Sequence, residues 1–365
     1  MHFLTNEHII DVLDMKSCLE ALEDVYHEME EQRAAFRPRM DFYVPQNPHY
    51  YRWGTVEGAS RRLGVFAIRM KSDMMVWNQE GTYQTEDKYC IQPGTYCGLI
   101  FLYSVKNGEP LALMNDGYLQ HMRVGACAGL GVKYLSRQNS RSLAMIGSGN
   151  MARTYAMAIC EVRPIQHIRV FSPTKVNREK YAREMTEKLQ ISVEPVDAPE
   201  TAIRGADIVA MTTDSLVPVI KAEWVEPGMH VTNVRKEEAG PDVYKIVDMV
   251  ARLGTSAFVL KDPPPNVIQG NGEIFATFAG TAEERRKVPP APERGSENPN
   301  KGTFSDIIAG RWAGRTNDRQ ITFVNNQGTG GLHFAALSYK AHELAKAKGL
   351  GHQLPLEWFV QNIRD

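Results

Sequence analysis

The stretch Gly147-Ser148-Gly149-Asn150-Met151-Ala152 places two glycines and a small residue at the spacing GxGxxA. An apolar run, SLAMIG, leads into it and predicts a strand, and a helical pattern follows it. The first glycine allows a tight turn, the second lets the backbone approach a pyrophosphate, and the small sixth residue lets helix and strand pack closely. The free N–H groups at the start of the helix then face the phosphates. These six residues therefore predict a dinucleotide site.

The end of the next predicted strand, HIRVFS, bears on the choice of dinucleotide. An NAD site usually has an Asp or Glu here, which binds the ribose 2′-hydroxyl. This chain has the hydroxyls of Ser172 and Thr174 and the cations Lys175 and Arg178. Hydroxyls and cations suit a 2′-phosphate, so the pattern favours NADP(H) over NAD(H). A solvated loop before a helix would have the same composition.

The elements that position the glycine turn alternate in type. From SLAMIG to HVTNV, strand-like runs alternate with helix-like runs, which indicates a parallel, doubly wound sheet. Just before them, YLQHMRVGACAGLGVKYL predicts a buried helix whose small residues permit close packing. Residues 262–303 are rich in Pro, Gly and charge and predict a loop excursion.

The N-terminal part of the chain has a different pattern. NEHIIDVLDMKSCLEALEDVYHEMEEQ has helical spacing, RLGVFAIRMKSDMMVW predicts a strand, and TYCGLIFLYSVKNGEPLALMND predicts a hairpin. A final helix, GTGGLHFAALSYKAHELAKAKGLG, is predicted to pack back on this half. We therefore predict a Rossmann-type α/β domain over residues 126–326, inserted in a second, α+β domain formed by residues 1–125 and 327–365.

Composition excludes several classes of protein. With 365 residues and 43% apolar content the chain can bury a large core, and a net charge of −1 gives no reason to expect nucleic acid or a membrane as partner. The segment MHFLTNEHIIDVLDM has acids inside its apolar run, unlike a signal peptide, and no uncharged run reaches the roughly 18 residues of a membrane span. The five cysteines form no CxxC pair, and no metal site is predicted. We expect a soluble, cytoplasmic protein.

Several stretches together resemble the ornithine cyclodeaminase/mu-crystallin family. In chain order they are RPRMDF, MRVGACAGLGVKYL, IGSGNMA, ADIVAMTT, WVEPGMHVTNV, DIIAGRWAGRTNDRQITF and the glycine-led C-terminal helix. The resemblance covers most of the chain. It implies a homodimer, in which the N-terminal region and the last helix form a substrate-binding and dimerisation domain around the Rossmann domain. It also implies chemistry at C=N bonds: reduction of imines or ketimino acids, oxidation of amino acids, or redox-neutral cyclodeamination.

The same resemblance assigns residues that bind a substrate carboxylate. Arg123 falls on the family's carboxylate-binding arginine, inside the predicted buried helix. A guanidinium suits that role because its planar fork makes two parallel hydrogen bonds. Arg39 matches a second substrate arginine, and Arg37 is a near competitor for this match.

The active-site lysine of the family lies on a strand that resembles GVFAIRMKSDMM. Alignment on Ser72 puts Arg69 at the lysine's position, whereas residue type selects Lys71. Positions two apart share a face of a strand, so both side chains can enter one site. We choose Lys71 as the catalytic group, because burial and neighbouring arginines can lower the pKa of an amine until it exchanges protons, and we predict a substrate contact for Arg69.

Two positions depart from the family pattern. Where the family commonly has an aspartate after HVTNV, this chain has Glu237, which matches by position and is a candidate acid/base. His333 stands at the substrate-facing start of the last helix, where the family usually has an aspartate suited to a distal ammonium. Both changes argue against a diamino acid as substrate. Further cofactor contacts are predicted at the ends of the later strands: Thr212, Thr213 and Val234.

The sequence thus predicts an NAD(P)-dependent oxidoreductase acting on a C–N or C=N bond, with a small carboxylate-bearing amine, imine or keto acid as substrate. Two alternatives stay open: an ornithine or lysine cyclodeaminase that recycles bound NAD, and a mu-crystallin-like protein that binds NADP(H) and a small ligand without catalysis. The aromatic residues between 45 and 95 (Tyr50, Tyr51, Trp53, Trp77 and Tyr83) are either core and interface residues or a lid for a bulkier substrate.

Overall fold

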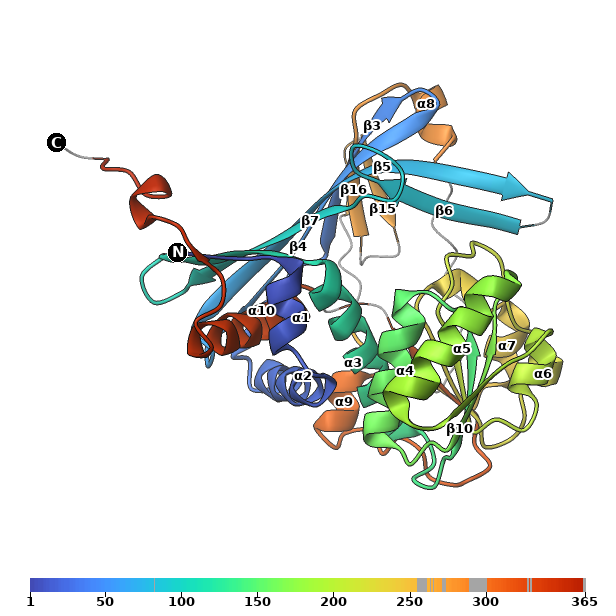
Figure 1. Ribbon diagram of the computed structural model, residues 1–365. Coiled ribbons are helices and arrows are strands. Elements are labelled where there is room, and N and C mark those ends of the chain that lie inside the picture. Colours follow the sequence, from blue (N-terminus) through green and yellow to red (C-terminus); the bar gives the residue numbers. More distant parts are fainter. Residues whose placement is uncertain are drawn as a thin grey trace.

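The computed structural model describes residues 1–363 apart from 82, 255–260, 263, 265, 271–273, 289–300, 327 and 329. Two β-sheets lie side by side, each with helices packed against it (Figure 1). The first sheet is built mainly from the N-terminal part of the chain, and the second from strands between residues 142 and 325. The site lies where these two units meet.

The large sheet is mixed. Its strand order is β15-β16-β3-β4-β5-β7-β8-β1-β19, with β2 beside β4 and β6 beside β5. Its strands are β1 (His2–Leu4), β2 (Ala34–Phe36), β3 (Arg39–Gln46), β4 (His49–Ser60), β5 (Val65–Glu80), β6 (Tyr83–Tyr89), β7 (Cys97–Ser104), β8 (Pro110–Asn115), β15 (Val267–Gly270), β16 (Ile274–Phe278) and β19 (His352–Gln353). The predicted strand at β5 and the hairpin β7–β8 are confirmed.

Part of the predicted loop excursion is not a loop. In the described part of residues 262–303, β16 runs parallel to β3 and β15 pairs with β16, so both extend the large sheet. The short run IFATF carries this pairing, because Phe275, Ala276 and Phe278 are buried there. Five such residues among prolines, glycines and charges give little sequence signal. The segment also returns to the large sheet from inside the range predicted as the Rossmann domain.

Helices cover one face of the large sheet. They are α1 (Asn6–Val12), α2 (Met15–Glu30) and α10 (Gly330–Ala347). The side chains of Thr5 and Asp14 cap α1 and α2 by accepting hydrogen bonds from backbone N–H groups in the first turn. The predicted return of the last helix is confirmed, since α10 packs against β4, β5 and α2.

The second sheet is parallel throughout and has the order β11-β10-β9-β12-β13-β18-β14-β17. Its strands are β9 (Ser142–Ile146), β10 (His167–Phe171), β11 (Ser192–Pro195), β12 (Ile208–Met211), β13 (His230–Asn233), β14 (Met249–Arg252), β17 (Lys301–Thr303) and β18 (Thr322–Asn325). β9 is the first strand of this sheet along the chain, and later strands lie on both sides of it, as predicted for a Rossmann-type fold. Ligands of such sheets bind beyond the carboxyl ends of the strands at this switch point.

Helices flank this parallel sheet and connect it to the large one. They are α3 (Gly117–Leu135), α4 (Asn150–Val162), α5 (Lys175–Leu189), α6 (Pro199–Ile203), α7 (Pro241–Ile246) and α9 (Phe304–Ile308). The short helix α8 (Ala282–Arg286) lies instead beside the large sheet, where the carbonyl oxygen of Glu284 accepts a hydrogen bond from the hydroxyl of Tyr50 (Figure 1). The predicted buried helix is α3, which packs against α4 so closely that a Cβ at Gly125 would lie 2.6 Å from the carbonyl oxygen of Thr154. This contact fixes α3 between the two units.

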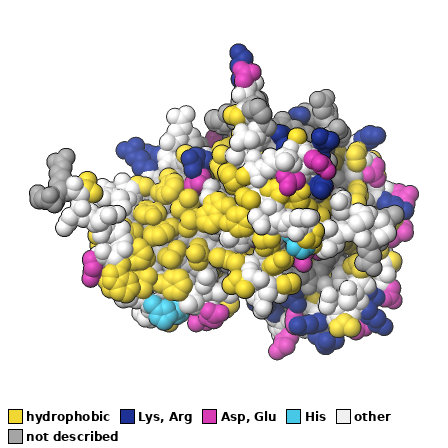
Figure 2. Space-filling view, turned by 90° about the horizontal axis from the view of Figure 1, so that it is seen from above, with side chains coloured by type: hydrophobic (Ala, Val, Ile, Leu, Met, Phe, Trp, Pro, Cys, Tyr) yellow, Lys and Arg dark blue, Asp and Glu magenta, His cyan; other side chains and the backbone are white. Residues whose placement is uncertain are grey.

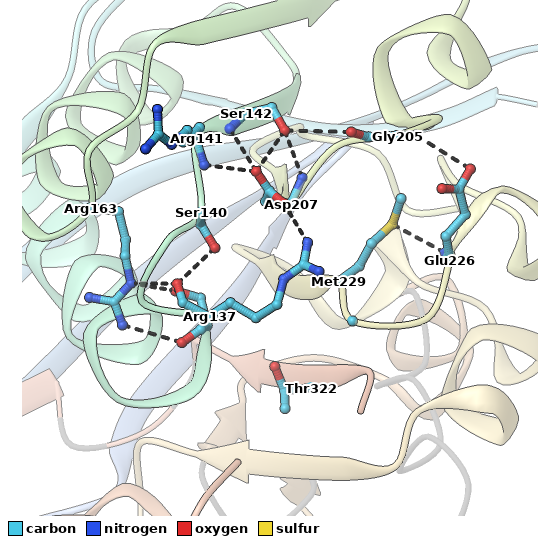
Figure 3. A network of polar contacts seen from close by, with 12 residues as sticks. Arg137, Ser140, Arg141, Ser142, Arg163, Gly205, Asp207, Glu226, Met229 and Thr322 are labelled. Carbon is cyan, nitrogen blue, oxygen red and sulfur yellow. Dashed lines mark hydrogen bonds and ion pairs between the residues drawn. The ribbon is translucent and has the colours of Figure 1, made fainter. Parts of the chain in front are cut away.

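The amino ends of the parallel strands are tied together by a polar network (Figure 3). Asp207, before β12, accepts hydrogen bonds from the backbone N–H groups of Arg141 (2.7 Å) and Ser142 (3.0 Å). It also pairs with Arg137. Arg163, at the end of α4, donates to backbone carbonyl oxygens in the last turn of α3. All of these bonds are formed between groups of this chain, so the network at this edge of the sheet contributes to stability.

Candidate active site

The glycine turn follows β9 and leads into α4. Gly147 has φ +110°, and a Cβ there would lie 2.7 Å from the carbonyl oxygen of Thr212, so only glycine fits. Gly149 is the N-cap of α4 and forms no side-chain cap, and a Cβ there would meet no atom within 4 Å. The helix N-terminus therefore faces open space with its N–H groups free for an anion. Ala152 is buried, which lets α4 pack on the sheet.

The loop after β10 lies beside this turn. The hydroxyl of Ser148 donates to that of Ser172 over 2.9 Å, and Thr174 and Lys175 are exposed. Arg178, in contrast, is buried: it donates to the carbonyl oxygens of Ser172 and Pro173 and pairs with Asp197. The predicted phosphate contact of Arg178 is thus corrected. Its guanidinium supports the loop backbone and is not presented to a ligand.

Glu238, which the sequence analysis did not select, organises the next two loops. Its buried carboxylate accepts hydrogen bonds from the backbone N–H of Thr213 (2.5 Å), the hydroxyl of Thr213 (2.8 Å) and the backbone N–H of Val234 (2.8 Å). Burial raises the pKa of Glu238 to about 7, although these hydrogen bonds act to lower it. The loops after β12 and β13 are therefore held at one carboxyl group. Its position next to Glu237 was the only sequence signal.

Lys71 stands on the helix-covered face of the large sheet, at the end of that face toward the Rossmann domain. It lies opposite Gly54 of β4 and Gly98 of β7. A Cβ at Gly54 would lie 3.1 Å from Lys71 Cε, and a Cβ at Gly98 would lie 2.1 Å from Asp116 Oδ1. Glycine on both sides therefore leaves room for these functional groups. Arg69, two residues away on β5, shares the face and pairs with Asp116.

The charge on Lys71 is controlled by its neighbours. Its side chain is 4% exposed, and its Nζ lies 2.8 Å from Asp73 Oδ2, which also accepts from Arg52 over 2.8 Å. Burial lowers the pKa of Lys71 well below its ordinary value, the charges of Arg39 and Arg52 lower it further, and Asp73 raises it. An amine in this environment gives up its proton more readily than an exposed lysine, as a group that exchanges protons with a substrate must.

Arg39 and Arg37 are separated by the sheet. Arg39 lies two residues from Asp41 on β3, its Nε donates to Asp41 Oδ1 over 2.7 Å, and its side chain is 27% exposed. The side chain of Arg37 is 68% exposed and pairs with Glu57 instead. Of these two arginines, Arg39 is the one whose charge lowers the pKa of Lys71.

Arg123 projects from α3 toward the same region. Its guanidinium carbon lies 5.1 Å from the centre of the Phe334 ring, and that of Arg69 lies 5.3 Å from the same ring. Its Nε donates to Gln120 Oε1 over 3.1 Å, and no acidic residue in the described part of the chain forms an ion pair with it. Burial lowers the pKa of Arg123 to about 10. Arg123 is therefore a cation in buried surroundings without an acidic partner among the described residues.

Unpartnered atoms also concentrate here. Among the described residues, several buried side-chain atoms of this cluster have no hydrogen-bond partner: Arg39 Nη2, Arg52 Nε, Asp73 Oδ1 and Asp116 Oδ1. Buried polar atoms are rarely left without a partner, because each one costs free energy. Their grouping beside Lys71 and Arg123 indicates that this face is completed by a polar ligand.

Glu237 reaches this cluster through a series of ion pairs. Glu237 Oε2 lies 3.9 Å from Arg235 Nε, and Arg235 Nη1 lies 3.6 Å from Glu86 Oε1. The same Glu86 oxygen lies 3.9 Å from Arg52 Nη1, and Arg52 bonds Asp73, the partner of Lys71. The predicted acid/base residues are thus connected across the two sheets. Glu86, Arg52 and Asp73 were not selected from the sequence, where they read as surface charges on strands.

His333 does not lie in the site. It is fully buried, with its Nε2 2.9 Å from the hydroxyl oxygen of Tyr26 and its Nδ1 3.4 Å from Cys127 Sγ. Burial and the charge of Arg123 lower its pKa well below the ordinary value, so the ring is neutral. The predicted substrate contact is therefore corrected: His333 belongs to the core beneath Arg123.

The structure places three of the five aromatic residues that were considered as a lid. Tyr50 and Trp77 pack on each other with ring centres 5.2 Å apart, and Trp53 lies on the opposite face of the sheet, 38% exposed. The side chain of Tyr83 lies outside the described residues. Within the described part of the chain, no set of three His, Cys, Asp or Glu side chains is placed to hold a metal ion. Nor does any helix there have the length and apolar character needed to cross a membrane.

Known proteins resemble this chain over most of its length. The family model described as ornithine cyclodeaminase/mu-crystallin matches residues 11–345. The Delta(1)-pyrroline-2-carboxylate reductase of Bacillus cereus is 28% identical over 263 residues, which is 71% of this chain and 74% of that protein.

Two solved structures share the fold. The Delta(1)-pyrroline-2-carboxylate reductase of Thermococcus litoralis, in complex with NADH and L-proline, has a TM-score of 0.76 at 24% identity and covers 97% of this chain and 100% of its own. An archaeal alanine dehydrogenase dimer with bound NAD has a TM-score of 0.72 at 23% identity, with 97% and 99% covered.

Proposed function

Because the chain belongs to the ornithine cyclodeaminase/mu-crystallin family, we propose that it is an NAD(P)-dependent oxidoreductase that reduces the C=N bond of a small carboxylate-bearing imine, or oxidises the corresponding amine. The observation that carries the proposal is that Arg123, a cation without an acidic partner among the described residues, lies over the same Phe334 ring as Arg69, which shares a strand face with the buried amine of Lys71. Arg123 and Lys71 together suit a substrate in which a carboxylate and a nitrogen are a few bonds apart.

Each part of the site has a role in this reaction. The turn from Gly147 to Ala152 would hold the pyrophosphate, and Arg123 and Arg39 would hold the substrate carboxylate. When bound, the nicotinamide supplies or accepts the hydride. Lys71 would donate the one proton that the substrate nitrogen needs during reduction and remove it during oxidation, and Glu237, linked to Lys71 by the series of ion pairs, is the second candidate for this acid/base role.

We also propose that NADP(H) is preferred to NAD(H). With Arg178 bound to the backbone, the preference rests on Thr174 and Lys175, which are exposed at the carboxyl end of β10. No acidic residue occurs from Ser172 to Arg178 that would repel a 2′-phosphate.

The second face of the large sheet supports a homodimer. Hydrophobic side chains gather on it (Figure 2), among them Met40 (42% exposed), Phe42 (40%) and Trp53 (38%). An apolar sheet face open to water marks an interaction surface. We propose that a second copy of the chain covers this face. The archaeal alanine dehydrogenase that shares the fold is a dimer, which is consistent with this proposal. Sedimentation should give twice the chain mass, and a monomer at micromolar concentration would contradict this.

A substrate screen tests the proposed activity. Cyclic imino acids, and keto acids supplied with ammonia or methylamine, would be mixed with NADPH or NADH while nicotinamide absorbance is followed. We expect oxidation of the cofactor that requires an α-carboxylate on the imine. Ammonia released from ornithine or lysine without a net absorbance change would instead establish a cyclodeaminase. Tight cofactor binding with no turnover of any member would establish a ligand carrier.

A further inference from the structure

One arm of the large sheet reaches across to the Rossmann domain. β5 pairs with β4 only as far as Met75 and with β7 only as far as Ser72. Beyond these residues β5 and β6 pair with each other, with Val76 opposite Asp87, and form a hairpin, described at residues 76–81 and 83–87, that projects over the parallel sheet (Figure 1). We call this hairpin the β5–β6 arm.

The arm is attached to the loop after β12 by backbone hydrogen bonding. The N–H of Leu216 donates to the carbonyl oxygen of Gln84 over 2.8 Å, and Thr85 and Ser215 form an antiparallel bridge. The loop itself is held by Glu238 through Thr213. The far end of the arm is therefore fixed to a loop at the carboxyl edge of the Rossmann sheet, where the cofactor site opens.

Glu86 is the charged residue at this junction. One of its oxygens, Oε1, is shared by Arg52 Nη1 at 3.9 Å and Arg235 Nη1 at 3.6 Å, and its Oε2 accepts from Trp77 Nε1 over 3.4 Å. Arg52 belongs to the large sheet and Arg235 to the loop that carries Glu237. The carboxylate is 18% exposed, so screening by water is incomplete.

The two arginines make the charge of the Glu86 carboxylate important for the contact between the two domains. Because both approach the same oxygen, their guanidinium groups face each other across it. With Glu86 ionised, each cation is attracted to the junction. Without its charge, Arg52 keeps Asp73 and Arg235 keeps Glu237 as partners, but the attraction that joins the two domains at this point is lost. One carboxyl group thus supplies the electrostatic contact between the two halves of the site.

We propose that Glu86 is a positioning residue, which holds the Rossmann loop with Glu237 and the sheet with Lys71 at their working separation through Arg235 and Arg52. The inference rests on the proposed function, because it assumes that Glu237 and Lys71 act in one reaction. Glu86 itself touches no reacting atom. Its loss should therefore slow the chemical step and leave the glycine turn able to bind the cofactor.

The test compares Glu86→Gln with Asp87→Asn. Gln keeps the size of Glu and removes its charge. Asp87 is the next residue on β6, exposed, and bonds only the adjacent backbone N–H, so it is a matched control for loss of one negative charge. Hydrogen exchange of the peptide containing residues 213–216 reports the attachment of the arm, and kcat and KM report the reaction. Glu86→Asp keeps the charge and serves as the rescue variant.

We expect faster exchange of this peptide in Glu86→Gln, a kcat lower by about 10- to 100-fold because the reacting groups are misplaced, and a KM for the cofactor within about twofold of wild type. Asp87→Asn should match wild type, and Glu86→Asp should recover most of kcat. Unchanged exchange or unchanged kcat in a folded Glu86→Gln protein would overturn the proposal. If Glu86→Gln does not fold, Arg235→Gln removes the same bridge from the other side and must give the same increase in exchange.

The two proposals fail separately. A wild-type protein that reduces no imine would refute the proposed function, whereas the exchange experiment would still decide whether Glu86 holds the arm in place.

Discussion

The glycine turn of the parallel sheet offers backbone groups to its ligand, whereas the large sheet offers charged side chains. Residues 147–152 contain no ionisable side chain. The large sheet brings Arg39, Arg52, Arg69 and Lys71 onto one face, with acids between them. A backbone site depends on chain geometry and is the same for any dinucleotide. A side-chain site depends on which charges remain unpaired, and it therefore sets what else can bind.

The largest effect is expected in the side-chain half. Lys71→Met keeps the volume but removes the amine that exchanges protons, so kcat should fall by about 100- to 10,000-fold. Cofactor affinity should be retained, because the glycine turn is untouched. Lys106→Met, at an exposed lysine in the β7–β8 turn, is the control. A kcat within tenfold of wild type would remove Lys71 from the reaction and leave Arg69, at the position that alignment favours, as the residue to test.

A comparable loss is expected in the backbone half, but in binding. Gly149→Asp puts a negative side chain where the pyrophosphate would approach, and calorimetry should show affinity for NADPH lower by about 100-fold or more. Gly149→Ala is the control for added bulk, since a Cβ there meets no atom within 4 Å; its melting temperature should fall only by the small amount expected from a poorer N-cap. Unaltered NADPH affinity in folded Gly149→Asp would contradict the dinucleotide assignment.

A smaller loss is expected at the carboxylate contact. Arg123→Lys keeps the charge but loses the fork and its second hydrogen bond, which at a partly desolvated site costs about 1.5–3 kcal/mol, or about 10- to 150-fold in kcat/KM. Cofactor affinity should barely change. A lower melting temperature with nearly wild-type kinetics would instead make Arg123 part of the scaffold over Phe334.

The same contrast explains what the sequence could predict. The Rossmann sheet and its turn follow from local patterns: an apolar strand, glycines at fixed spacing and a helix. Arg39, Lys71 and Arg123 were named through family resemblance. Their common location depends on strand register and on how α3 and β5 both pack against α10, neither of which a local pattern encodes.

The errors have the same origin. Arg178 and His333 have residue types suited to ligands, but tertiary contacts use them otherwise: Arg178 holds the loop backbone, and His333 packs against Tyr26 and Cys127. Glu86 was missed because its partners, Arg52 and Arg235, are distant in sequence. A charge on a strand gives no sign of being shared between two domains.

The smallest expected effect concerns stability at the edge of the Rossmann sheet remote from the cofactor. His230 is fully buried, its Nδ1 lies 2.9 Å from the hydroxyl oxygen of Thr322, and burial lowers its pKa from 6.5 to about 3. Between these values the unfolded chain binds more protons than the folded one, so the free energy of unfolding falls as the pH decreases. One such group costs about 2 kcal/mol between pH 6.5 and 5.

Urea unfolding of wild type and His230→Asn at both pH values measures this term. The variant should lose less stability on acidification than wild type, whereas His352→Gln, at an exposed histidine, should lose as much. An equal pH dependence in wild type and His230→Asn would show that His230 is protonated without unfolding.

The central claim is that hydride passes between the nicotinamide and the carbon of a C=N bond in a substrate held by its carboxylate. It is tested most directly with NADPH deuterated at both C4 positions and an imine identified by the screen, followed by mass spectrometry of the amine product. We expect one deuterium on the carbon that bears the carboxylate, and labelled product formed about 10- to 150-fold more slowly at low substrate concentration with Arg123→Lys. Product that forms without deuterium on that carbon would contradict it.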